Sequence, residues 1–132
     1  MNCSSPSVEP VNQYVSYSEH DSESAPGVRY RIARMSFARR LELVRKVRDL
    51  AQKIEFLDAG TGAQDRIERS VLGGEVDRLY LEWGLQAVAG LTIDGESATP
   101  ALLIEKGPES LAREIAGRIR AECHLSEDER KN

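Results

Sequence analysis

Residues 37–57, FARRLELVRKVRDLAQKIEFL, carry the apolar pattern that decides the class of fold. Apolar residues recur there at spacings of four and three, which places them in one row along an α-helix. The row consists of Leu43, Val47, Leu50, Ile54 and Leu57. Ser36 precedes the pattern and offers a hydroxyl that can cap the first turn. The stretch therefore predicts one long helix.

The apolar surface of this predicted helix is wider than a single row. Phe37, Leu41, Val44 and Ala51 add a second set of apolar side chains beside the first. A helix that is apolar over a wide arc needs partners on more than one side. We therefore expect it to pack against other helices and not only against a small sheet.

A second helical pattern follows the linker DAGTGAQD at residues 58–65. The pattern predicts a helix over 64–83 that forms a helical hairpin with the first. Its apolar members are Ile67, Val71, Leu72, Val76, Leu79, Tyr80 and Trp83. Gly73 and Gly74 lie in its middle, where they either admit another backbone or break the helix. We favour a single helix through this pair, which leaves room for a bend.

Two short β elements are expected beside the helices. Residues 28–34 alternate between apolar side chains and arginines, which is the period of a strand with one buried face. The apolar members of this strand are Val28, Tyr30 and Ile32. A turn and strand near 88–97 follow the second helix, and Asp94-Gly95 within them is typical of a tight two-residue turn.

Two further helices are predicted toward the C-terminus. Thr99 can cap a short helix that starts at Pro100, a position where the missing N–H costs nothing. A longer helix starts after Pro108, and its expected buried face is Leu111, Ala112, Ile115, Ala116, Ile119 and Cys123. Ser126 and Glu129 match a capping box, but too few residues remain after them for another stable helix.

Residues 1–27 differ from the rest of the chain, because they are rich in Ser, Pro and acids and have no apolar period. Such a segment buries too little apolar area to offset the entropy of ordering. We expect a disordered acidic arm there and a single helical domain over 28–132. The expected fold class is mainly α, a helical hairpin plus C-terminal helices with a small β element.

The charge of the chain is unevenly distributed, although its net value is only −4. Residues 28–57 carry nine bases and three acids, and both flanking parts are acidic. The bases at 29–53 suit contacts with phosphates, but the pI of about 5.3 and the lack of a nucleic-acid-binding motif argue against that use. A solvated helix face, self-association or an acidic partner explains them as well.

The sequence shows no segment that would take the chain to or through a membrane. Its longest central apolar run covers 83–93, whereas a membrane helix needs about 18 or more such residues. The N-terminus has neither the basic lead nor the apolar run of a secretion signal. We therefore expect a cytoplasmic protein, in which Cys3 and Cys123 remain reduced thiols.

No residue pattern points to an enzyme. His20 lies in the expected arm and His124 at the end of the last long helix, so a catalytic triad is not expected. Asp94 and Glu96 flank Gly95 at a turn, where such acids bond their own backbone. Phosphate-binding glycine motifs and metal-ligand spacings are missing from the sequence. We expect no catalytic residue, no cofactor and no metal.

The order of features over about residues 80–132 resembles the small tail assembly chaperones of long-tailed bacteriophages and prophages. The features are Trp83, the apolar step Gly90-Leu91, the turn Asp94-Gly95-Glu96, the helix start Thr99-Pro100, the break Gly107-Pro108 and an amphipathic helix over 111–123. The resemblance implies a helical protein of the host cytoplasm. Such a chaperone binds the tape-measure protein and helps to recruit tail-tube subunits around it.

A carrier for a long amphipathic helix needs an apolar groove between its own helices. The candidate groove residues are Leu43, Val47, Leu50, Ile54, Leu57, Leu79, Trp83, Ile115 and Ile119. All nine also suit simple core packing. Two other functions stay open: a regulatory or packaging protein that binds nucleic acid through 29–53, and a structural subunit of the virion.

Overall fold

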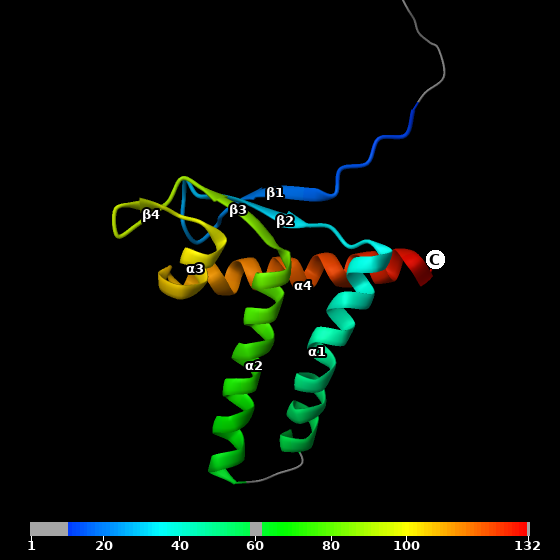
Figure 1. Ribbon diagram of the computed structural model, residues 1–132. Helices are drawn as coiled ribbons and strands as arrows, with labels where there is room; N and C mark the ends of the chain where they lie inside the picture. The colour runs from blue at the N-terminus through cyan, green and yellow to red at the C-terminus, as the bar shows by residue number, and fades with distance from the viewer. Residues whose placement is uncertain (1–10, 59–61, 132) are drawn as a thin grey trace, which may run out of the picture.

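The computed structural model describes residues 11–58 and 62–131. Its elements are β1 (Tyr17–Asp21), β2 (Arg29–Ala33), α1 (Phe37–Asp58), α2 (Ala63–Gly84), β3 (Leu85–Ala89), β4 (Thr92–Ile93), β5 (Glu96–Ser97), α3 (Pro100–Lys106) and α4 (Glu109–Lys131). Figure 1 shows a body made of the sheet, α3 and α4, from which α1 and α2 extend side by side as a helical hairpin. A mainly helical fold with small β elements is confirmed.

The first helix begins where the sequence predicts it. The Arg39 N–H donates to Ser36 Oγ at 3.3 Å, and the Arg40 N–H donates to the Ser36 carbonyl at 2.9 Å. Ser36 therefore caps α1. The helix then packs along α2, with Leu43 buried and Val47 partly buried in the common core.

The expectation that α1 has helical partners on more than one side is wrong for its second apolar set. Phe37 is 82% exposed, and Leu41 and Val44 are about half exposed. The main neighbour of α1 is α2, since α4 runs past only its first turns (Figure 1). The part of the arc formed by Phe37, Leu41 and Val44 is therefore open surface, whereas Ala51 lies outside the side chains that the structure describes.

The second helix is continuous through its glycine pair. A Cβ atom built on Gly73 or Gly74 meets nothing within 4 Å, so neither glycine admits a neighbouring backbone. The close approach lies instead at Gly84, the last residue of α2, where an added Cβ would lie 2.9 Å from Ile119 Cγ2. Because Gly84 has no side chain, the end of α2 can lie close to Ile119 of α4.

The sheet contains a strand that the sequence did not predict. β1 pairs antiparallel with β2, and β2 pairs antiparallel with β3, so that the order is β1-β2-β3. β1 covers Tyr17–Asp21, which corrects the expectation of a disordered arm over 1–27; residues 1–10 of that arm lie outside the described residues. Backbone pairing with the predicted strand β2 orders this polar segment despite its few apolar residues.

The connection from β4 to α3 follows the sequence prediction. Asp94 and Gly95 have φ values of 51° and 82°, and both positive angles are what a tight turn between antiparallel strands requires. Thr99 Oγ1 then accepts a hydrogen bond from the Leu102 N–H at 3.1 Å. α3 starts at Pro100 directly after this cap.

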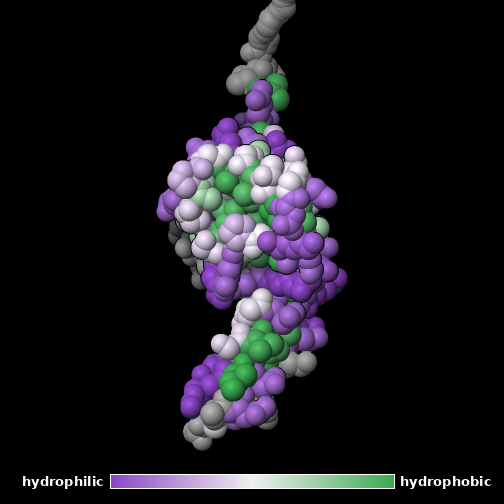
Figure 2. Space-filling model, turned by 90° about the vertical axis from the view of Figure 1, so that its left-hand side faces the viewer, coloured by the Kyte–Doolittle hydropathy of each residue, from purple (hydrophilic) through white to green (hydrophobic). Residues whose placement is uncertain are grey.

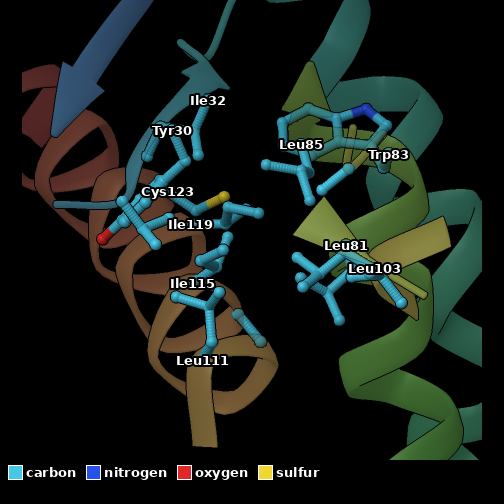
Figure 3. Packing of buried hydrophobic residues seen from close by; sticks show 14 of the residues in the cluster. Tyr30, Ile32, Leu81, Trp83, Leu85, Leu103, Leu111, Ile115, Ile119 and Cys123 are labelled. Atoms are coloured by element: carbon cyan, nitrogen blue, oxygen red, sulfur yellow. The ribbon is translucent and has the colours of Figure 1, made fainter. Parts of the chain in front are cut away.

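The core of the body is built on α4. Leu111, Ile115 and Ile119 are fully buried, and Figure 3 shows them pointing toward side chains from α2, α3 and the sheet. Burying an aliphatic side chain of this size stabilises a fold by about 1.5–3 kcal/mol. α4 continues to Lys131, which corrects the predicted end near His124; neither Gly nor Pro follows Cys123 to stop it.

Candidate protein-binding groove

The candidate groove residues named from the sequence do not line a common open surface. The buried ones are Leu43, Trp83, Ile115 and Ile119, and the partly buried ones are Val47, Leu50 and Leu79. Ile54 and Leu57 lie on α1, outside the residues whose side chains the structure describes. The buried members belong to the core, so a surface for a partner must be formed by other residues.

An open apolar row lies on α2 instead. Ile67 is 61% exposed and Val71 is 56% exposed, one helical turn apart. Figure 2 shows this apolar patch on the helical hairpin, below the rounded body. Gly74, Arg78 and Leu81 continue the same row toward the body at helical spacing.

The row leads into two adjoining cavities where α2 meets α3 and α4. The first has a volume of about 190 Å³ and is lined by Gly74, Asp77, Arg78, Leu81, Ile104, Glu109, Ala112 and Arg113. The second, of about 310 Å³, shares Arg78 and Ile104 with the first. We call the surface formed by Ile67, Val71 and Gly74 on α2, with Ile104 and Ala112 at the first cavity, the α2 groove; the core residue Leu81 also lines this cavity.

Small residues shape the floor of the α2 groove. Gly74 contributes no side chain at the point where the exposed row enters the first cavity, and an added Cβ there would meet open space. Ala112 on α4 is the small residue opposite, and it is partly buried. The first atom of a side chain at Gly74 would therefore enter the groove without a clash.

Paired charges form the rim of the α2 groove. Arg78 Nε lies 3.1 Å from Glu82 Oε2, and this hydrogen bond raises the pKa of the Arg78 guanidinium. Arg113 bonds Glu109 at 2.7 Å across one turn of α4, and Arg120 pairs with Asp77. The acids that line the cavities are Asp77, Glu82, Glu105 and Glu109, and each of them lies within 4.0 Å of an arginine nitrogen.

A second open apolar row lies on α1, formed by Phe37, Leu41 and Val44. We call it the α1 row. Arg45 is exposed beside the row, and the exposed Arg48 continues the row one turn further along the helix. The row thus combines three apolar side chains with a basic end.

Much of the predicted basic segment 29–53 is engaged within the chain. Arg31 bonds Glu19 at 3.1 Å and stacks over the ring of Tyr17 at 4.0 Å. Other intrachain contacts join Arg29 to Asp21, Arg34 to the Val15 carbonyl, Arg39 to the Trp83 carbonyl and Arg40 to the Cys123 carbonyl. These arginines fasten β1 and α1 to the body, and Arg45, Lys46 and Arg48 are exposed.

Glu114 is the most strongly perturbed carboxyl group of the described residues. Its oxygens accept hydrogen bonds from the Ser24 side chain at 2.7 Å, from the Ser22 side chain at 2.9 Å and from Tyr30 at 3.2 Å. Burial raises the pKa of Glu114, but hydrogen bonds from Ser24, Glu23 and Ser22 outweigh it and lower that pKa to about 2. A carboxylate held ionised in this way anchors the β1–β2 connection to α4 and is unsuited to proton transfer near neutral pH.

The other titratable groups considered in the sequence lie apart from the α2 groove. His20 is on β1, where its Nε2 lies 2.9 Å from Ser18 Oγ, and burial together with the nearby Arg118 charge lowers its pKa. Asp94 lies at the β4–β5 turn, 4.0 Å from Lys106 Nζ. Among the side chains that the structure describes, no cluster of ligating groups suits a metal ion, and no described helix has both the length and the apolar content to cross a membrane.

In comparisons with known proteins, no family model, no curated sequence and no solved structure matches this chain. The α2 groove is therefore interpreted from its own geometry. The sequence placed Ile67 and Val71 in the same apolar set as Leu72 and Val76, although the two pairs lie on different arcs of the helix. The sequence signal for the groove was the spacing i, i+4, i+7 of Ile67, Val71 and Gly74, which places them on a different side of the helix from Leu72 and Val76.

Proposed function

We propose that this protein is an assembly chaperone or adaptor that holds a helical segment of another protein in the α2 groove. The observation that supports the proposal is the exposed row of Ile67 and Val71, which continues past Gly74 into an open cavity between three helices. An amphipathic helix binds such a groove through apolar anchors at i, i+3, i+4 and i+7. The protein would act by binding alone, without catalysis.

The client that we propose is the tape-measure protein of a long-tailed phage or prophage. This choice rests on the resemblance of residues 80–132 to tail assembly chaperones. A tape-measure protein is a long helical chain that needs its apolar stripe covered before tail-tube subunits assemble around it. The α2 groove has the chemistry for this task, because its centre is apolar and its rim is formed by paired charges that leave the apolar centre open.

The nucleic-acid alternative is less well supported than protein binding. Five arginines of the basic segment make contacts within the chain, namely Arg29, Arg31, Arg34, Arg39 and Arg40. A phosphate-binding surface needs several free cations on one face, and the affinity it gives falls steeply with salt. Salt-dependent binding to generic duplex DNA would support this alternative, and detection of the protein in finished particles would support a virion subunit.

Adjacent glycines on α2 allow a matched test of the proposed client site. The wild type and two variants, Gly74→Leu and Gly73→Leu, are titrated against fragments of candidate tape-measure proteins by fluorescence anisotropy. Gly74→Leu fills the floor of the groove and should weaken binding by about tenfold or more, which corresponds to the loss of one apolar anchor. Gly73 does not line the cavity, so Gly73→Leu should bind as the wild type does.

Circular dichroism of both variants verifies that α2 is intact. Equal weakening by the two leucines would contradict the α2 groove as the client site. If no tape-measure fragment binds but an unrelated basic amphipathic helix binds tightly, the α2 groove remains the proposed binding site. The tape-measure protein would then be excluded as its client.

A further inference from the structure

We propose that β1 is a pH-sensitive strand, which separates from the body when His20 gains a proton in mild acid. In the described part of the chain, β1 is an outer strand of its sheet and pairs along one edge only, with β2. His20 lies within β1, on the face that turns toward α4. The inference does not depend on the α2 groove or on the identity of any client.

The face of β1 that packs on the body is polar. His20 lies opposite Tyr30 in the register of the sheet, with the two rings 5.7 Å apart, and directly opposite residues point to the same face. Tyr30 is 2% exposed and its hydroxyl bonds Glu114 of α4, so this is the inner face. Ser18 shares the inner face, and its Oγ lies 2.9 Å from His20 Nε2. Because β1 brings no aliphatic side chain to the core, hydrogen bonds and charges decide how strongly it docks.

Two arginines and one acid act on the charge of the His20 ring. They are Arg118 and Glu122 on α4 and Arg34 directly after β2. Burial and the Arg118 charge lower the pKa of His20, the Arg34 charge adds to this, and the Glu122 charge opposes it. Arg118 is itself only partly neutralised, because its nearest acid in the loop after β1 is Glu23 at 4.0 Å. A proton on His20 therefore places a third positive charge near two arginines, with one carboxylate to offset it.

The other groups that hold β1 in place keep their charge in mild acid. Glu114 fastens the loop after β1 through two serine hydroxyls; although burial acts in the opposite direction, these hydrogen bonds lower the pKa of Glu114 to about 2. Burial raises the pKa of Tyr30 above its ordinary value of 10, so its hydroxyl stays neutral. Carboxyl groups ordinarily titrate near pH 4 and guanidinium groups above 12, whereas histidine titrates near 6.5. The sequence contains two histidines, His20 and His124, and the second serves as a control.

Acid acts on the docking of β1 in one direction. Because the pKa of His20 is below 6.5 when β1 is docked, the separated strand takes up the proton more readily. Docking is therefore most favourable above pH 6.5 and weakens as the pH falls from 6.5 through the lowered value. Separation frees one edge of β2 and the segment before β1, in which Val11 and Tyr14 are already mostly exposed. The pH thus controls whether this edge of β2 is available to pair with another strand.

Hydrogen exchange of the full chain, followed by NMR at pH 7.5 and pH 5.5, tests the inference. The Ser22 N–H donates to the Val28 carbonyl at 2.8 Å, so this amide and those of β1 report separation of the strand. After correction for the pH dependence of exchange itself, their protection should fall by about twofold or more at pH 5.5, whereas amides of α4 near Ile115 should keep theirs. His20→Gln should abolish this change, and His124→Gln should leave it as in the wild type.

A direct titration of the wild type needs no variant, and it remains decisive if His20→Gln disturbs β1 at pH 7.5. The ring signals of His20 give its pKa in the full chain and in a peptide of residues 11–27, in which the rest of the sheet is missing. The pKa should be lower in the full chain, and an equal or higher value there would overturn the proposal. Protection of β1 that is the same at both pH values in the wild type would also overturn it, as would an equal change in His20→Gln and in the wild type.

Discussion

The body and the helical hairpin of this molecule use apolar residues in opposite ways. In the body, Leu111, Ile115 and Ile119 have no exposed surface and belong to one buried cluster with residues of α2, α3 and the sheet. On the hairpin, Phe37 and Val71 are mostly exposed although they occupy regular helical positions. A row of apolar residues at helical spacing therefore marks a helix, but it does not say whether the row is covered by the same chain.

The contrast separates stability from recognition. Burial of the α4 side chains in the body supplies the free energy that keeps the fold together. The exposed rows on the hairpin add little to that free energy, because their surface stays in water in the isolated chain. Apolar patches that a fold leaves uncovered are typical of surfaces for other proteins.

The largest expected difference is in the free energy of unfolding, between Ile115→Ala in the body and Leu41→Ala on the hairpin. Ile115→Ala removes a fully buried side chain and should lower the free energy of unfolding by about 3–4 kcal/mol, through lost burial and the cavity left behind. Leu41→Ala shortens a half-exposed side chain and should change the free energy of unfolding by less than about 0.5 kcal/mol. Urea unfolding followed by circular dichroism measures both. Similar losses would mean that the α1 row is covered in solution.

A smaller loss of unfolding free energy is expected at Glu114, which bonds the loop after β1 to α4. Glu114→Gln keeps the shape of the side chain but removes the charge that Ser22, Ser24 and Tyr30 bond. The expected loss is about 1–2 kcal/mol of unfolding free energy, after a discount for solvent screening at this partly exposed site. Thermal unfolding at pH 7 would show it.

The pH dependence of the Glu114 effect has a defined sign. The folded pKa of about 2 lies below the reference value of 4.5, so the contribution is fully present above pH 4.5 and is lost as the pH falls from 4.5 to about 2. The stability difference between the wild type and Glu114→Gln should therefore shrink over that window. A difference that is constant down to pH 2 would mean that Glu114 acts by packing alone.

The helices of the fold could be predicted from the sequence because local signals mark them. Ser36 and Thr99 cap α1 and α3 as expected, and the apolar face of α4 from Leu111 to Ile119 is buried as predicted. Asp94-Gly95 makes the expected turn. Each of these features depends on residues that are close in the chain.

Features that depend on distant residues could not be predicted. β1 has few apolar residues, and its order comes from pairing with β2 and from the bonds between its following loop and Glu114, about ninety residues away. The α2 groove needs α3 and α4 to meet α2 at Gly74 and Leu81. Nothing local in the sequence distinguishes a buried helical row from one that stays open.

The smallest predicted effect tests whether the hairpin is a separate unit of stability. Gly73→Ala and Gly74→Ala each enter open space inside α2, so each should stabilise the helix by about 0.5–1 kcal/mol through reduced backbone entropy. Hydrogen exchange should slow for amides of α1 and the outer part of α2, because a weakly buried hairpin opens without the body. The amides of α4 around Ile115 should exchange as in the wild type, since they open only with the whole core. Equally slowed exchange of the α4 amides would show that the hairpin and the body unfold as one unit. The two regions would then differ in how exposed their apolar residues are, but not in their stability.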